Sequence, residues 1–172
     1  AFKMDLISVI ICTYNRATVL GETLQSWLSV DAAALDVELI IVDNNSNDET
    51  AQVAASFQDT YPGRLRVVRE PEIGLSHARN RAIQEASGTI LAFVDDDVYF
   101  DSGWLKAIHG AFDDNPGISS VGGKSIPIFE TAVPEWMTEE MHKFYGSTRS
   151  GDQDRLMIFP EHPYGLNMAF RK

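Results

Sequence analysis

The chain alternates short apolar runs of strand length with longer segments whose apolar residues share one helical face. The uninterrupted run Ile-Leu-Ala-Phe-Val at residues 90–94 is typical of a parallel strand that is buried on both faces. Similar runs at residues 6–12 and 37–42 predict two more buried strands, and the shorter run at 65–69 predicts a strand at an edge of the sheet. We expect the run at 90–94 to be the central strand.

Four segments between and after these strands have the periodicity of amphipathic helices. The first helix is defined by apolar residues at the 3.6-residue period, namely Leu20, Leu24, Trp27 and Leu28. The others are predicted around Val53 and Phe57, over residues 75–86 with Gly88 placed to end the helix, and around residues 104–112. Strands that alternate with helices predict an α/β fold with a mainly parallel twisted sheet and helices on both faces.

The pattern becomes irregular beyond Val121. Prolines and glycines interrupt it, and we predict a short amphipathic helix within residues 134–145 and a mobile polar loop over residues 147–154. A strand is predicted at residues 156–159, and residues 165–172 are expected to begin another element. Residues 122–172 therefore differ in organisation from the first 121 residues.

Composition restricts the classes of function. With 172 residues, of which 44% are hydrophobic and 23% charged, the chain fits one domain with a sizeable core. The 14 Lys and Arg residues and 25 Asp and Glu residues give a formal net charge of −11, with no basic stripe. Because binding to a phosphate backbone requires clustered Lys and Arg, nucleic acid is excluded as the main partner. The single cysteine, Cys12, lies within an apolar run and is predicted to be a core residue.

Hydropathy gives no sign of membrane insertion. No stretch approaches the roughly 18 consecutive apolar residues of a membrane span, and no signal peptide is recognisable. We therefore expect a cytoplasmic location. Peripheral association with the inner face of the membrane stays open, and the sequence does not indicate an oligomeric state.

Three consecutive aspartates, Asp95, Asp96 and Asp97, directly follow the central apolar run. Acidic residues are disfavoured inside strands, so we expect them at the carboxyl end of the strand, the edge where open α/β sheets bind ligands. Neighbouring carboxylates repel each other, by roughly 4 kcal/mol per pair about 4 Å apart at an effective dielectric near 20. A bound cation would remove this repulsion, and a ligand set made only of oxygen atoms favours Mg²⁺ or Mn²⁺ over zinc. The alternative is a solvated acidic turn that also caps a helix beginning near Asp101.

The sequence does not match three known motifs for phosphate binding or phosphoryl transfer. The turn after the first strand, residues 13–17, lacks the glycines of a dinucleotide-binding fingerprint. Gly123-Lys124-Ser125 would need a glycine where Ile118 stands to form a P-loop. Dehalogenase-like phosphatases carry Thr or Val two places after the second Asp of Asp-x-Asp, and this chain has Tyr99 there, after the fourth strand and not the first.

Polar residues follow three of the predicted strands. They are Thr13, Tyr14, Asn15 and Arg16 after the first strand, residues 43–48 after the second, and the three aspartates after the fourth. If these strands adjoin, a nucleotide suits the shared edge, because Asp43 can accept from a pyrimidine imide N–H, Thr13 can bond a base or ribose, and Asp95 can bind ribose hydroxyls. Arg79 and Arg81 could reach a phosphate. Taken singly, each of these residues could equally be a turn residue or a surface ion-pair partner.

Segments at residues 8–16, 41–48, 74–80 and 93–97 closely resemble, in order, the family 2 glycosyltransferases. Gly-Leu-Asn-Met-Ala-Phe-Arg at residues 165–171 is similar to the family's Gly-x-Asn-x-Ala-Phe-Arg segment. The resemblance implies the GT-A fold, a Rossmann-like α/β fold of nucleotide-diphospho-sugar transferases. It also implies inverting transfer of a sugar from a nucleotide diphosphate sugar, expected to be a UDP-sugar, to a hydroxyl of a glycan, lipid-linked or other acceptor. The alternative is a non-catalytic nucleotide-sugar-binding or regulatory module.

The resemblance implies roles for individual residues. It places the donor substrate against Thr13, Tyr14, Asn15, Arg16, Asp43, Asn45, Arg79, Asp95 and Asp96. It also makes Asp95 and Asp97 the ligands of Mn²⁺ or Mg²⁺, with Asp97 on the metal and Asp95 or Asp96 on the ribose or metal.

The general base is not assigned. In the family it is an acidic residue well beyond the Asn-Met-Ala-Phe-Arg segment, so we expect it beyond Lys172. Accordingly, residues 1–121 are predicted to be a nucleotide-sugar-binding subdomain and residues 122–172 the beginning of a truncated acceptor-side region. Residues 134–145 are either an acceptor-side wall or simple packing over the sheet. His162, between two prolines, fits a loop residue better than a late metal ligand.

Overall fold

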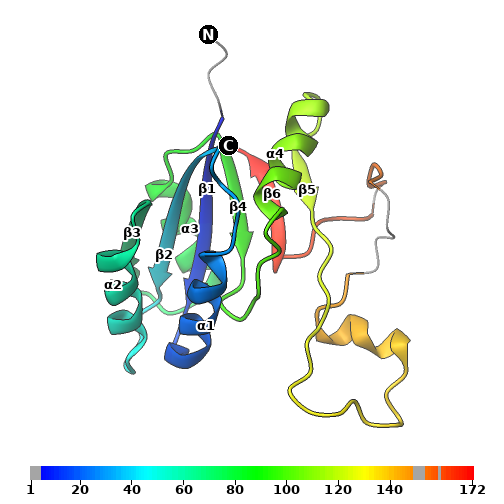
Figure 1. Cartoon of the computed structure of the whole chain (residues 1–172), viewed down its shortest axis with the longest axis horizontal. Helices are drawn as coiled ribbons and strands as arrows, with labels where there is room; N and C mark the ends of the chain where they lie inside the picture. The colour runs from blue at the N-terminus through cyan, green and yellow to red at the C-terminus, as the bar shows by residue number, and fades with distance from the viewer. Residues whose placement is uncertain (1–4, 149–153, 159) are drawn as a thin grey trace.

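The computed structural model describes residues 5–148, 154–158 and 160–172, and its centre is one six-stranded sheet (Figure 1). The strand order is β3-β2-β1-β4-β6-β5. The strands are β1 (Leu6–Thr13), β2 (Asp36–Asp43), β3 (Arg64–Arg69), β4 (Ile90–Val94), β5 (Ser120–Gly122) and β6 (Asn167–Arg171). β1 to β4 pair in parallel, and β6 runs antiparallel to both of its neighbours. This confirms the predicted mainly parallel sheet, with β3 at an edge.

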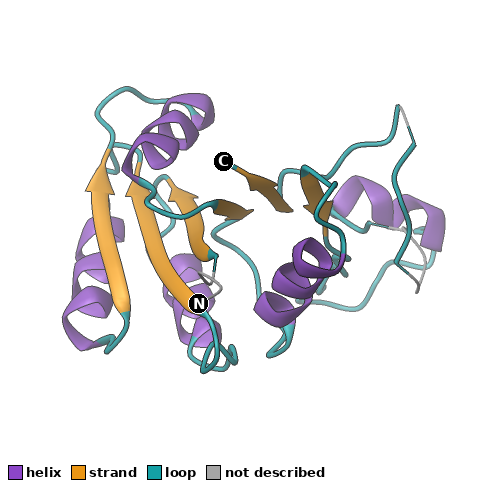
Figure 2. Cartoon of the chain, turned by 90° about the horizontal axis from the view of Figure 1, so that it is seen from above, coloured by secondary structure: helices purple, strands orange, loops and turns teal. Residues whose placement is uncertain are grey.

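Helices cover both faces of this sheet (Figure 2). They are α1 (Ala17–Trp27), α2 (Thr50–Thr60), α3 (Leu75–Glu85) and α4 (Trp104–Asp114). A further 3₁₀ helix, η1 (Glu139–Tyr145), belongs to neither core. α1, α2 and α4 share one core, in which Trp27 and Phe112 are fully buried. On the other face, Ala78 and Ala82 of α3 pack against residues such as Ile10 and Phe93. None of the helices in the described part of the chain has the length and apolar composition needed to cross a bilayer.

The last strand, β6, is inserted between β4 and β5. Ala169 pairs with Ala92 of β4 on one side and with Val121 of β5 on the other. The sequence indicated an element here but not its partners, because β5 has only three residues and its pairing closes a long loop. The proposed division of the chain after residue 121 stays a prediction, and β6 belongs to the same sheet as β1 to β4.

One prediction for the region before β6 was wrong, and a second was right about the position of a short helix. Residues 156–158 form no strand: Arg155 pairs with Glu161 at 2.7 Å and the Ile158 amide donates to the same carboxylate at 2.9 Å, which folds the segment into a local turn. Phe159 lies outside the described residues, as do residues 149–153 of the predicted loop. The helix expected within residues 134–145 is the 3₁₀ helix η1, which buries no residue and so lacks the packed face that stabilises an α-helix.

Gly88 has a different role from the predicted one. α3 ends at Glu85 with Ala86 in an extended conformation, so no glycine terminates the helix. A Cβ atom at Gly88 would lie 2.6 Å from the Leu6 carbonyl oxygen and 2.6 Å from Ser8 Oγ. The glycine therefore permits the close approach of the chain to β1 as it enters β4.

A buried carboxylate, Glu38 of β2, ties three segments together near the amino ends of the strands. It accepts hydrogen bonds from Ser8 Oγ at 2.6 Å, the Ser87 amide at 2.6 Å and Arg66 Nη2 at 3.2 Å. Burial acts to raise the pKa of Glu38, but these donors outweigh burial and lower it below its usual value. Glu38 therefore links β1, β3 and the entry to β4 as a charged group.

Replacing Glu38 with glutamine is expected to lower the free energy of unfolding at pH 7 by about 2 kcal/mol. The reason is that glutamine has one acceptor oxygen for donors that bond both carboxylate oxygens of Glu38, and its NH₂ group would face one of these donors. Since the folded-state pKa is depressed, the stabilisation by Glu38 is present above its unfolded pKa and is lost as the pH falls through the folded pKa. Urea unfolding of wild type and variant from neutral to acidic pH measures this difference. The exposed Glu135→Gln variant is the control, and an equal loss of stability in both variants would contradict the assignment.

Candidate functional site

The carboxyl ends of β1, β2 and β4 bring the predicted site residues together. Thr13 and Asp43 are paired in register at the ends of β1 and β2, and both are buried. Arg16, in the turn after β1, lies 2.7 Å from Asp97 Oδ2 and 3.5 Å from Asp96 Oδ1, through its Nη1 atom. Side chains that are far apart in the sequence thus share one edge of the sheet.

Two asparagines shape the turns after β1 and β2. Asn15 and Asn45 adopt left-handed conformations, with φ of 52° and 64°, which Asn tolerates better than most residues. The turns also interlock, because the Asn15 amide donates to Ser46 Oγ at 3.0 Å and Asn15 Oδ1 accepts from the Asn47 amide at 2.8 Å. Both turns are therefore held against each other by side-chain contacts.

Asp43 and Asn45 are themselves anchored. Asp43 Oδ1 accepts a hydrogen bond from the Ser46 amide at 3.0 Å, and Asn45 Oδ1 accepts from Arg69 Nη2 at 2.7 Å. The Ser46 bond occupies only part of the acceptor capacity of a carboxylate, which has about four lone-pair directions. Asp43 can thus accept a further hydrogen bond from a ligand.

The hydroxyl group of Thr13 is buried and incompletely satisfied. It helps to stabilise the charge of the nearby Asp96 carboxylate but makes no well-formed hydrogen bond with any described residue. A buried polar atom without such a bond costs roughly 1–3 kcal/mol. A polar ligand atom at this edge would remove that cost.

The three aspartates differ in exposure. The side chains of Asp95 and Asp97 are 43% and 48% exposed, whereas that of Asp96 is 10% exposed. Burial, and then the charge of Asp97, raises the pKa of Asp95, and burial also raises the pKa of Asp96. The site therefore carries more negative charge than its arginines neutralise, which favours a bound cation.

Arg79 approaches the same site from α3. Its Nη2 atom lies 4.0 Å from Asp95 Oδ1 and donates to the Gly165 carbonyl oxygen at 3.2 Å. Arg81 does not join it, because its Nε atom pairs with Glu85 on the same helix at 2.9 Å. Tyr14 is half-exposed beside the turn after β1.

The carboxylates of the acidic triplet are the candidate ligands of a divalent cation. No group of three or more His, Cys, Asp and Glu side chains in the described ranges is arranged to hold a metal by itself. Asp95 and Asp97 do fit a Mg²⁺-like ion of the kind that takes one or two carboxylates and completes its coordination with substrate phosphates. The alternative of a helix cap is not supported, since Asp101 and not the triplet accepts from the Gly103 amide, at 2.8 Å.

His162 forms no metal-holding group with these carboxylates among the described residues. It is exposed in a loop, and its Nδ1 atom is 3.2 Å from the Pro160 carbonyl oxygen. This placement agrees with the interpretation of His162 as a loop residue.

Asn44 was included in the predicted polar stretch at residues 43–48 but was given no role of its own. Its Nδ2 atom donates to the Glu72 carbonyl at 2.7 Å and its Oδ1 atom accepts from the Gly74 amide at 2.7 Å. Asn44 thereby fixes the segment that leads into α3, and with it the helix that carries Arg79. An asparagine after a strand indicates side-chain bonding to backbone, but not a partner about 30 residues away.

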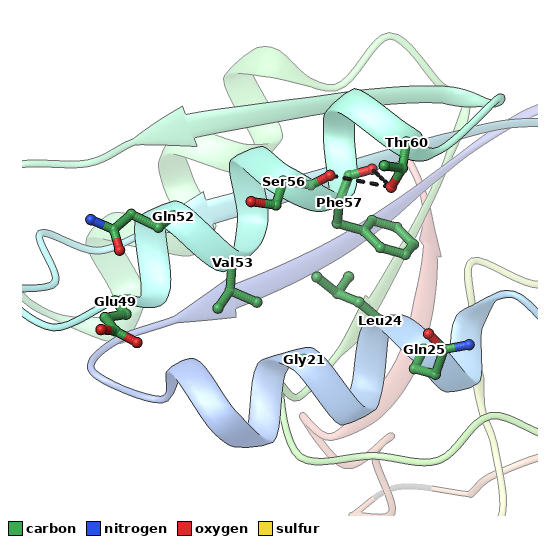
Figure 3. A pocket seen from close by; sticks show the side chains of 9 residues that line it. All are labelled: Gly21, Leu24, Gln25, Glu49, Gln52, Val53, Ser56, Phe57 and Thr60. Atoms are coloured by element: carbon green, nitrogen blue, oxygen red, sulfur yellow. Dashed lines mark hydrogen bonds between the residues drawn. The ribbon is translucent and has the colours of Figure 1, made fainter.

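A separate groove lies between α1 and α2 (Figure 3). It has a volume of about 470 Å³ and is lined by apolar residues such as Leu24 and Phe57 together with polar ones such as Gln25 and Glu49. None of the predicted site residues lines it. The candidate site is therefore the edge where the loops converge and not this groove.

Comparison with known protein families and sequences gives a consistent result. A family described as "Glycosyl transferase family 2" matches residues 8–171. The chain is 28% identical over 168 residues to a glucosyl-dolichyl phosphate glucuronosyltransferase of Haloferax volcanii, covering 96% of this chain and 52% of that protein. It is 27% identical over 174 residues to the poly(ribitol-phosphate) β-N-acetylglucosaminyltransferase TarS of Staphylococcus aureus, covering 92% of this chain and 30% of that protein. The chain thus spans about half or less of the length of these relatives.

Solved structures share the fold. The mannosyltransferase PcManGT of Pyrobaculum calidifontis, in complex with GDP-Man and Mn²⁺, superposes with a TM-score of 0.72 at 22% identity, over 99% of this chain and 45% of that one. S. aureus TarS residues 1–349 in complex with UDP-GlcNAc superposes with a TM-score of 0.63 at 27% identity, over 75% of this chain and 37% of that one. The α/β architecture described above is therefore that of GT-A glycosyltransferases.

Proposed function

The chain belongs to glycosyl transferase family 2, and from that premise we propose that it binds the donor of an inverting, metal-dependent glycosyltransferase. The donor is a nucleotide diphosphate sugar, with UDP as the nucleotide, and the acceptor is a hydroxyl group. The observation that carries the proposal is the convergence of the buried Thr13 and Asp43 pair with the acidic triplet at one edge of the sheet.

Thr13 and Asp43 are the proposed base-binding residues. Asp43 keeps acceptor capacity beyond its bond to Ser46, and the Thr13 hydroxyl has no well-formed hydrogen bond within the described structure. Together they can accept from an imide N–H and bond a carbonyl or ribose oxygen. The structure of TarS with UDP-GlcNAc supports a uridine nucleotide in a relative of 27% identity.

Asp95 and Asp97 would hold Mn²⁺ or Mg²⁺, with Asp96 beside them and Arg79 and Arg16 as the nearby cationic groups. The metal, when bound, supplies positive charge that stabilises the departing diphosphate. PcManGT shows that this fold accommodates a nucleotide sugar together with Mn²⁺. The half-exposed carboxylates of Asp95 and Asp97 leave room for ligands that come from the substrate.

The acceptor is proposed to be a glycan or a lipid-linked sugar. The names of two relatives support this kind of acceptor, since one is named for glucosyl-dolichyl phosphate and the other for poly(ribitol-phosphate). A lipid-linked acceptor would agree with the expected cytoplasmic location at the inner face of a membrane. The general base stays unassigned, and residues 122–172 are proposed to belong to the acceptor side.

Calorimetric titration of UDP, GDP and UMP, each with Mn²⁺ and with EDTA, tests this function. UDP is expected to bind about tenfold or more tightly with Mn²⁺ than with EDTA, because the cation bridges the acidic site to the diphosphate. UMP, which lacks the diphosphate, should gain much less. Release of UDP from UDP-sugars then separates a transferase from a non-catalytic binding module, and absence of UDP binding would contradict the proposal.

Arg16 is expected to compete with the metal. Hydrogen bonding to Asp97, together with the charge of Asp96, raises the pKa of Arg16, so the guanidinium is a permanent cation on these carboxylates. Arg16→Gln should tighten Mn²⁺ binding to the nucleotide-free protein about two- to fivefold, in keeping with the value of an exposed ion pair. Electron paramagnetic resonance of free Mn²⁺ measures this. Arg64→Gln, which breaks the exposed pair with Asp36 at the other end of the sheet, is the control, and weaker binding by Arg16→Gln would refute the competition.

A further inference from the structure

The loop that follows β4 is attached to α1 by side chains of the helix. Thr23 is fully buried, its Oγ1 atom donates to the Asp96 carbonyl oxygen at 2.8 Å and it accepts from the Val98 amide at 3.1 Å. One turn further along the helix, Ser26 Oγ accepts from the Phe100 amide at 3.2 Å. The loop backbone therefore hydrogen-bonds to α1 at every second residue from 96 to 100.

The three-residue spacing of Thr23 and Ser26 lets their two hydroxyls hold the loop that follows β4. Residues three apart on a helix lie on the same face, so Thr23 and Ser26 point toward the same strip of loop. The Thr23 hydroxyl donates to the Asp96 carbonyl and accepts from the Val98 amide through one oxygen atom, and an apolar side chain would leave both groups unsatisfied.

Thr23 acts on the backbone between the two proposed metal ligands. It holds the carbonyl of Asp96, which follows Asp95, and the amide of Val98, which follows Asp97. The direction of both flanking carboxylates depends on this stretch of backbone. Asp43 of the base-binding pair is anchored separately, because its carboxylate accepts from the Ser46 amide.

We propose that Thr23 is a positioning residue that holds the Asp95 and Asp97 carboxylates in the arrangement that binds a divalent cation with a nucleoside diphosphate. This inference rests on the proposed function. It assigns to α1 a role beyond packing, since the same helix that buries Leu20, Leu24 and Trp27 also orients the acidic loop. A hydroxyl with a purely structural role would affect stability without affecting metal-dependent binding.

The test compares UDP affinity with Mn²⁺ and with EDTA by calorimetry. Thr23→Val keeps the shape and removes both hydrogen bonds, and it should reduce the Mn²⁺-dependent gain in UDP affinity about tenfold, as for other groups that orient metal ligands. UDP affinity in EDTA should stay within about twofold of wild type, because the base-binding turns are untouched. Thr23→Ser keeps the hydroxyl and should restore the gain to within about twofold of wild type.

Two further variants complete the design. Thr60→Val removes a hydroxyl that donates to carbonyl oxygens of its own helix α2, and should leave the gain unchanged. Ser26→Ala, which removes the neighbouring attachment, should reduce the gain by a smaller factor and serves if Thr23→Val does not fold. Two results would overturn the positioning role of Thr23 without affecting the proposed function. One is a Mn²⁺-dependent gain in UDP affinity that is unchanged in both Thr23→Val and Ser26→Ala, and the other is an equal loss of UDP affinity with Mn²⁺ and with EDTA. A wild-type protein without any Mn²⁺-dependent gain would overturn the proposed function, and this inference with it.

Discussion

Asp97→Asn is expected to lower the release of UDP from a UDP-sugar roughly 100- to 10,000-fold, because metal stabilisation of the departing diphosphate is worth several kcal/mol and each 1.36 kcal/mol is a factor of ten. The variant keeps the shape of the side chain, removes its charge and replaces one acceptor oxygen with an NH₂ donor. Steady-state assays at saturating UDP-sugar and Mn²⁺ measure the rate. UDP affinity in EDTA should change little, because the contacts to the base are made by other loops.

The loss would not reflect unfolding. The Asp97 side chain is 48% exposed and its partner Arg16 is equally exposed, so their ion pair contributes about 1 kcal/mol or less to stability. Asp101→Asn makes the same chemical change four positions along the same loop, and its side-chain oxygen can still accept from the Gly103 amide. A rate for Asp97→Asn close to that of Asp101→Asn would exclude Asp97 from the metal site.

The second large effect is expected at Asp43. Asp43→Asn should weaken UDP binding about 10- to 100-fold, because a buried acceptor for the imide N–H becomes an amide that can present a donor to it. The bond from the Ser46 amide can be kept by the asparagine oxygen, so the turn should survive. CDP, whose ring N3 accepts instead of donating, should lose less affinity than UDP or gain affinity.

The ratio of CDP to UDP affinity therefore measures the role of Asp43 independently of overall binding. Asp36→Asn, at the opposite end of β2, is the matched control and should leave the ratio unchanged. If Asp43→Asn weakens CDP and UDP by the same factor, the carboxylate supports the turn and does not read the base.

Much of the sheet could be predicted from the sequence because its signals are local. The run at residues 90–94 coincides with β4, and the polar residues after the runs at 6–12 and 37–42 mark the ends of β1 and β2. The parallel arrangement then implied that Thr13 and Asp43 meet, and the register pairs them. The fold and the location of the candidate site therefore followed from hydrophobic periodicity and the order of the strands.

Other features depend on contacts that the local pattern does not contain. β5 is too short to show periodicity, and it forms only because β6 pairs with it from 46 positions or more along the chain. Gly88 was expected to end a helix, whereas its small size is needed against Leu6 and Ser8, which are 80 residues or more away. Leu28 was assigned to the buried face of the first helix but lies beyond the end of α1, half-exposed.

Thr23 illustrates the same limit within the site. It lies between apolar positions of α1 that the 3.6-residue pattern identifies, and a threonine there has no distinguishing signal. Its partners, Asp96 and Val98, are 73 and 75 residues away. The sequence singles out the carboxylates proposed as metal ligands, but it contains no signal for the side chain that we propose orients them.

We propose that the loops after β1, β2 and β4 bind one nucleoside diphosphate through a divalent cation. A crystal structure with UDP and Mn²⁺ is the direct test of this arrangement. Anomalous scattering from manganese locates the ion without reference to the refined side chains. We expect an anomalous peak in contact with the Asp97 carboxylate, with the diphosphate against it and the uracil ring beside Thr13 and Asp43. Manganese or UDP bound elsewhere, for instance in the groove between α1 and α2, with none beside Asp97, would contradict it.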